Sequence, residues 1–217
     1  MTVKLREPVS GLTHLAGAIL SILALILLVY YAVVHATVWH IVAFSIFGAS
    51  MILLYTASSL YHLLNISEKG IRILRKIDHM MIYVLIAGTY TPICLVALRG
   101  VWGWSLLSSV WVIALSGIIM KAVWMGAPRW LSTSIYTIMG WIVVIAFIPL
   151  VRTVPVGGII WMVAGGLLYS IGAVIYGTKW PKINSRIFGF HEIFHLFVLG
   201  GSFCHFWLMY RYVLYLG

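Results

Sequence analysis

The sequence predicts an all-α membrane protein, a polytopic bundle of seven transmembrane helices that forms a single domain over residues 1–217. Hydrophobic residues make up 63% of the chain and charged residues 8%, and the mean hydropathy is +1.09. Soluble domains carry about 25% charged residues. So few polar side chains cannot cover a folded chain in water, whereas a lipid bilayer needs no polar cover.

Apolar runs long enough to cross the membrane as helices, roughly 20 residues each, occur seven times. The first run follows a basic segment, as the apolar region of a signal peptide would, but it is longer than the 7–15 residues of such a region, and we expect it to be retained. Short connections leave no room for another domain. The predicted helices cover residues 11–34, 40–64, 78–98, 103–124, 131–151, 157–177 and 191–214.

Prolines and glycines mark irregular or closely packed places in these runs. Pro92 and Pro149 lie late in the third and fifth runs, and each should kink or end its helix because proline lacks an N–H donor. The glycine pairs of the last two runs should allow close approach of neighbouring helices. These pairs are Gly165 with Gly166 and Gly200 with Gly201.

The basic residues of the connections predict the orientation of the bundle. Eleven Lys and Arg residues fall on one side and three on the other. Because cytoplasmic loops carry the excess of Lys and Arg, the N-terminus should be cytoplasmic and the C-terminus outside, in the cell membrane. Topology also explains the net charge of +10 better than nucleic-acid binding does. The inner residues are Lys4, Arg6, Lys69, Arg72, Arg75, Lys76, Lys121, Arg129, Lys179, Lys182 and Arg186, and the outer ones are Arg99, Arg152 and Arg211.

Three histidines form the candidate metal site. His191 and His195 stand four residues apart in HEIFH, so a helix places them on one face, one turn apart. The topology brings His62, in the last turn of the second run, to the same depth. Three imidazoles with an open fourth position are typical of catalytic zinc. We therefore predict Zn²⁺ on these three residues; the alternative is that each histidine only hydrogen-bonds to a neighbouring helix.

Polar residues near the histidines carry two interpretations each. Asp78 would orient the metal's water and accept its proton, or it would cap the third helix. Ser58 shares a helix face with His62 and would bond to that water or to Asp78, or to its own backbone. HEIFH matches the zinc-protease motif H-E-x-x-H, so Glu192 either acts on the water or is an acid at a helix N-terminus.

The remaining histidines and the cysteines are weaker candidates. His14 lies near the inner end of the first helix and could reach the rim of the site. His205 lies ten residues past His195, about 15 Å along the helix, which excludes it from the same coordination sphere. Cys94 and Cys204 have neither a disulfide nor a metal-type spacing, so they should be packing residues.

Four segments resemble the hemolysin III family, the bacterial branch of the progestin and adipoQ receptor proteins. They are EPVSGLTHLAG, SSLYHLL, RKIDHMMIYVLIAGTYTP and HEIFHLFVLGGSFCHF. The resemblance implies a seven-helix bundle with intramembrane zinc, and by position it gives His62, His191 and His195 as ligands. It also gives Asp78 and Ser58 as the acid and serine near the metal's water.

Three functions are compatible with these features. The first is a zinc-dependent hydrolase of a lipid amide or ester at the inner leaflet, since the wider superfamily includes alkaline ceramidases. The second is a non-enzymatic sensor or regulator of membrane homeostasis with structural zinc. The third is hemolysin-like cytolysis. In each case the expected partners are membrane lipids, with no nucleic acid.

Overall fold

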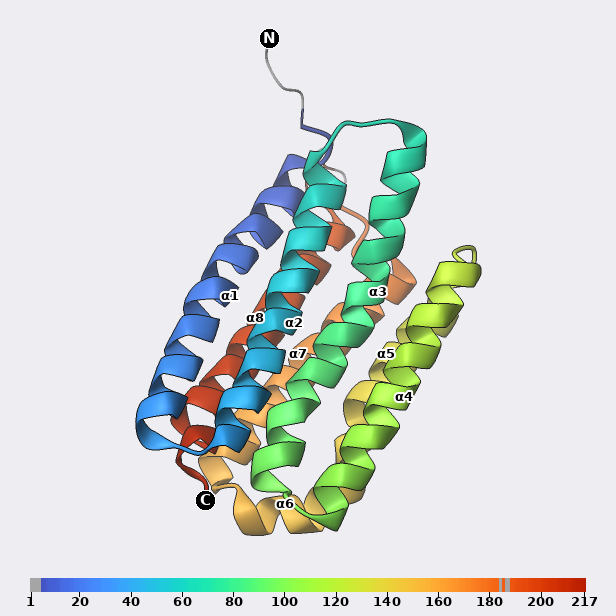
Figure 1. The fold of residues 1–217 in the computed structure, drawn as a ribbon. Coiled ribbons are helices and arrows are strands. Elements are labelled where there is room, and N and C mark those ends of the chain that lie inside the picture. The colour runs from blue at the N-terminus through green and yellow to red at the C-terminus, as the bar shows by residue number, and fades with distance from the viewer. Residues whose placement is uncertain (1–4, 184, 186–187) are drawn as a thin grey trace.

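The structure, a computed structural model, describes residues 5–183, 185 and 188–217, and the regular secondary structure within these ranges consists of helices alone (Figure 1). Seven helices there are long and apolar enough to cross a membrane, which confirms the predicted fold class. The helical elements are α1 Pro8–His35, α2 Val38–Leu63, α3 Glu68–Pro92 with a π-helical extension Ile93–Ala97, α4 Val101–Val123, α5 Arg129–Trp141, a 3₁₀ segment Ile142–Ala146, α6 Phe147–Thr153, α7 Val156–Thr178 and α8 Phe190–Arg211, followed by a 3₁₀ turn Val213–Tyr215.

The largest departure from the predicted boundaries is the start of the third helix. It begins at Glu68, ten residues before the predicted position 78. Ser67 caps it, because the Ser67 hydroxyl accepts a hydrogen bond from the Gly70 N–H at 3.3 Å. The prediction placed the start of this helix by hydropathy, which excludes the charged residues after Glu68, although a helix can extend beyond the lipid. Asp78 therefore lies about three turns inside α3, and its interpretation as a helix cap is wrong.

Both prolines coincide with breaks in the regular helix. The α-helical part of α3 ends at Pro92, after which the chain continues as the π-helical segment. Pro149 lies in the first turn of α6, just after the 3₁₀ segment that interrupts the fifth span. A first turn tolerates proline because its N–H would have no partner there. The predicted irregularities are confirmed at both places.

The start of α1 and the C-terminus lie at opposite ends of the bundle, as an odd number of crossings requires (Figure 1). The N-terminal end also holds the end of α2 and the starts of α3 and α8. Which end faces the cytoplasm stays a prediction from the charge distribution. Of the eleven residues assigned to the inner side, Lys4 and Arg186 lie outside the described residues.

The outer surface of the bundle is apolar. Large side chains such as Leu20, Val101 and Val156 are well exposed, whereas in water a surface of this kind would drive association. In lipid the same surface is in its natural solvent, and the helices satisfy their own backbone hydrogen bonds. The chain is therefore a multi-pass protein of the cell membrane.

Candidate metal centre

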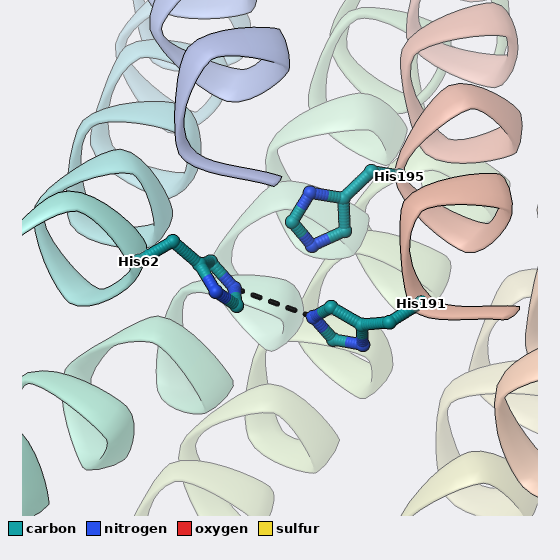
Figure 2. Close-up of side chains that lie close together, drawn as sticks. All are labelled: His62, His191 and His195. Atoms are coloured by element: carbon teal, nitrogen blue, oxygen red, sulfur yellow. Dashed lines mark hydrogen bonds between the residues drawn. The ribbon is translucent and has the colours of Figure 1, made fainter. Parts of the chain in front are cut away.

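Three histidine rings meet between α2 and α8 near the N-terminal end of the bundle (Figure 2). His62 comes from the last turn of α2, and His191 and His195 come from the first two turns of α8. One ring nitrogen from each lies within 4.8 Å of the other two, and the Nε2 atoms of His62 and His191 are 3.3 Å apart. This group could hold a metal ion.

The burial of the rings makes the grouping significant. His62 and His195 are 1% and 2% exposed. Ionisable groups at such depth in a membrane protein are costly unless they have partners, and they mark functional places. The i, i+4 spacing in the sequence brings His191 and His195 together on α8. The position of His62 depends instead on the tertiary structure, in which α2 and α8 both pack against α1.

Hydrogen bonds behind two of the rings fix which nitrogen faces the centre. The His62 Nδ1–H donates to the Glu7 carboxylate, and the His195 Nδ1–H donates to the Ser10 carbonyl oxygen at 3.2 Å. Carbonyl and carboxylate oxygens only accept, so in the neutral form of each ring the lone pair lies on Nε2, and the His62 Nε2 faces the His191 Nε2 at 3.3 Å. Carboxylates and carbonyls in this position orient metal-binding histidines and raise their basicity.

The segment before α1 is thus part of the site, which sequence reasoning missed. The Glu7 N–H donates to the His62 carbonyl oxygen at 3.0 Å, which holds this segment against the end of α2. The hydrogen bond from His62 lowers the pKa of the Glu7 carboxyl below its usual value. A signal was present, since Glu7 is one of only four acids in the chain.

Glu192 is occupied at the start of α8. One oxygen accepts a hydrogen bond from the Gly189 N–H at 2.8 Å, and the other accepts one from the Ser10 hydroxyl at 2.5 Å. The interpretation of Glu192 as an acid at a helix N-terminus is confirmed. It also ties α8 to the start of α1, so it holds in place the two elements that supply His195 and the carbonyl behind it.

Asp78 and Ser58 lie beside the histidine group. Both are buried, at 8% and 1% exposure. The Ser58 hydroxyl interacts with the Asp78 carboxylate, and His62 lies within electrostatic range of that carboxylate. The structure therefore brings all five predicted residues to one end of the bundle, while the roles of Asp78 and Ser58 stay predictions.

A cavity of about 750 Å³ opens from this place into the bundle. Its size falls in the range of about 300–1,000 Å³ that small-molecule sites occupy. Asp78, Ser58, His191 and His195 lie at one end of its wall, and most of the rest is apolar. Its apolar lining includes Leu54, Ile82, Ile86, Val144, Met162 and Val198.

Three other histidines, His14, His79 and His205, line the same cavity. The His14 ring stacks on His195 with centroids 3.6 Å apart, so the expectation that it reaches the site is confirmed. His205 lies further along α8 and is absent from the metal-type group found among the described residues. The two cysteines are buried and unpaired, as predicted.

A family model described as Haemolysin-III related matches residues 2–206. The chain belongs to the hemolysin III family. It is 43% identical over 215 residues to Hemolysin-3 of Bacillus cereus, covering 99% of this chain and 95% of that protein. It is 45% identical over 202 residues to the Hemolysin-3 homolog of Bacillus subtilis (strain 168), covering 93% and 91%.

The relation of the hemolysin III family to adiponectin-receptor-like proteins is also visible. The chain is 42% identical over 50 residues to the ADIPOR-like receptor IZH2 of Saccharomyces cerevisiae, which covers 21% of this chain and 16% of that protein. The resemblance inferred from the four sequence segments is therefore confirmed.

Proposed function

We propose that this hemolysin III family protein is a zinc-dependent hydrolase of a lipid amide or ester at the inner leaflet. The observation that supports the proposal is the connection between three converging imidazoles and a largely apolar cavity. A carboxylate and a hydroxyl, those of Asp78 and Ser58, lie in the wall where the two meet. Such a cavity would hold an acyl chain and bring its polar end to the histidines.

The residues fit zinc. Zinc–nitrogen bonds of about 2.0–2.1 Å in a tetrahedron imply nitrogen atoms about 3.3–3.4 Å apart. The 3.3 Å between the His62 and His191 Nε2 atoms agrees with this value. Imidazole is a good zinc ligand, and the metal-type group among the described residues has three members, which leaves a tetrahedral position for a small molecule.

The chemistry follows from the residues around that position. Bound zinc would supply a Lewis acid that polarises a carbonyl and lowers the pKa of a water to about 7. Asp78 would accept the proton of the attacking water and return it to the leaving amine or alcohol. Ser58 would hold the Asp78 carboxylate in place, and the apolar walls would keep bulk water out, which strengthens each of these interactions.

The test is metal analysis and lipid turnover on the purified chain in nanodiscs. His195→Ala should lose zinc and turnover together, whereas Asp78→Asn should keep zinc and lose turnover by about 10²–10⁴-fold. His35→Ala, an exposed histidine at the other end of α1, is the matched control and should change neither.

Three results would contradict the proposal. Turnover in zinc-free protein would exclude the metal from the chemistry. Zinc at one equivalent without product from any amide or ester lipid would favour a structural metal in a regulator. Leakage of dye-loaded vesicles at a low protein ratio, unaffected by Asp78→Asn, would favour the lytic activity that the names of the Bacillus relatives imply.

A further inference from the structure

Three cationic side chains from three helices line the cavity close to the metal centre. They are Arg75 of α3, Lys121 of α4 and Arg129 of α5. Lys121 is only 3% exposed. A lysine near the end of a membrane helix usually extends its ammonium group to water. Lys121 lies against the cavity instead, although a buried cation is costly and is a mark of function in membrane proteins.

Among the described residues, no acid forms a salt bridge with this cluster. The ion pairs among the described residues are those of Arg6 and His62 with Glu7, and of Arg72 with Glu68. Asp78 is the one acid among the residues that line the cavity. Arg129 donates to the Tyr176 carbonyl oxygen at 3.2 Å, and no described partner forms a hydrogen bond with the Lys121 ammonium group or the Arg75 guanidinium.

The cations also repel one another. Lys121 lies within electrostatic range of Arg75, and His79 lies within range of both and of Arg129. Among the residues that line this largely apolar cavity, three positive charges and one carboxylate leave an excess of two positive charges. An anion would offset this repulsion and gain charge-assisted hydrogen bonds.

We infer that Arg75, Lys121 and Arg129 bind the phosphate or carboxylate head of an anionic amphiphile whose hydrocarbon chain occupies the cavity. Basic pockets between membrane helices on the cytoplasmic side bind acidic lipid head groups in this manner. The cavity supplies the complement for the chain, since its remaining wall is mostly apolar.

The position of the cluster also bears on the substrate. Arg129 lines one small pocket together with His62 and His191, so a head group bound to Arg129 would lie close to the histidine group. The cleaved bond would then lie close to the anionic head. This position of the cleaved bond rests on the proposed hydrolysis, whereas the binding of the anionic amphiphile is independent of it.

A competing explanation is that the three cations only set the membrane topology. Two neighbouring cations, Arg72 and Lys76, have the contacts expected of residues with only that role. Arg72 pairs with Glu68 at 3.3 Å, and Lys76 donates to the Ala122 carbonyl oxygen at 3.0 Å. Neither residue is among those lining the cavity. Arg72, one turn from Arg75 on the same helix, is therefore a matched control.

The experiment measures binding of phosphatidic acid with a fluorescent acyl chain to the full chain in phosphatidylcholine nanodiscs. Phosphatidylcholine with the same labelled chain and inorganic phosphate are the comparison probes. Lys121→Met should weaken phosphatidic acid binding about tenfold or more, since a hydrogen bond to a charged group is lost. Lys121→Arg should restore most of this affinity, and Arg72→Gln should keep an affinity within about twofold of the wild type. If Lys121→Met does not fold, Arg75→Gln tests the same cluster at an exposed position.

The inference is overturned by equal affinity of the wild type for the two labelled lipids. It is also overturned if Arg72→Gln loses as much affinity for phosphatidic acid as Lys121→Met does, or if inorganic phosphate binds as tightly as phosphatidic acid. Absence of turnover with retained binding would sink only the hydrolase, and turnover of neutral lipids without anionic binding would sink only this inference.

Discussion

Replacing Glu7 tests whether the segment before α1 supports the candidate metal centre. The Glu7 carboxylate accepts the hydrogen bond from the His62 Nδ1–H, while its backbone N–H is bonded to the His62 carbonyl oxygen at 3.0 Å. Glu7→Gln keeps an acceptor oxygen and the backbone bond but removes the negative charge. Glu7→Ala removes the acceptor as well. The two variants therefore separate the effect of charge from that of orientation.

The expected loss is in metal affinity. Groups that hydrogen-bond to metal-binding histidines typically contribute 10–100-fold to affinity, so we expect about tenfold from Glu7→Gln and about 100-fold from Glu7→Ala. At saturating zinc this loss lowers the free energy of unfolding by about 1.4 and 2.7 kcal/mol, because the binding energy adds to stability. Zinc titration against a chromophoric chelator measures the affinity, and thermal unfolding with and without zinc measures the stability.

Glu68→Gln is the matched control. Its side chain, in the first turn of α3, is 93% exposed, and Arg72 is its one ion-pair partner among the described residues. We expect its zinc affinity to stay within about twofold of the wild type, since exposed ion pairs contribute little. Unchanged affinity in Glu7→Ala, or an equal loss in Glu68→Gln, would refute the role of Glu7 behind His62.

Three shorter predictions address metal removal and packing. A zinc chelator should lower the unfolding temperature of the wild type, and added zinc should restore it, while His195→Ala should respond to neither. Gly165→Ala should destabilise the bundle by about 1–3 kcal/mol because its new Cβ would lie 2.8 Å from the His205 Nε2. Gly166→Ala should not, since its nearest neighbour would be Trp141 at 3.9 Å; equal losses in chemical unfolding would contradict this reasoning. Cys94 and Cys204 are buried, so a polar thiol reagent should label neither until the protein unfolds.

The sequence alone determined the seven spans and the pairing of His191 with His195. Both depend on features that are local along the chain, since apolar length decides whether a helix can cross lipid and the i, i+4 spacing sets a helical face. The alternation of the spans then placed His62 at the same depth. The predicted third span missed the first ten residues of α3 because these residues include several charges, and hydropathy measures the preference of a segment for lipid and not for the helical conformation.

Only the tertiary structure decided what surrounds these histidines. Glu7 and His62 are 55 residues apart in the chain, and the Ser10 carbonyl is 185 residues from His195. The burial of Lys121 against the cavity likewise depends on how α4 packs near α3 and α5. Side-chain contacts between distant segments depend on the angles and offsets of packed helices, and no local pattern of residues encodes them.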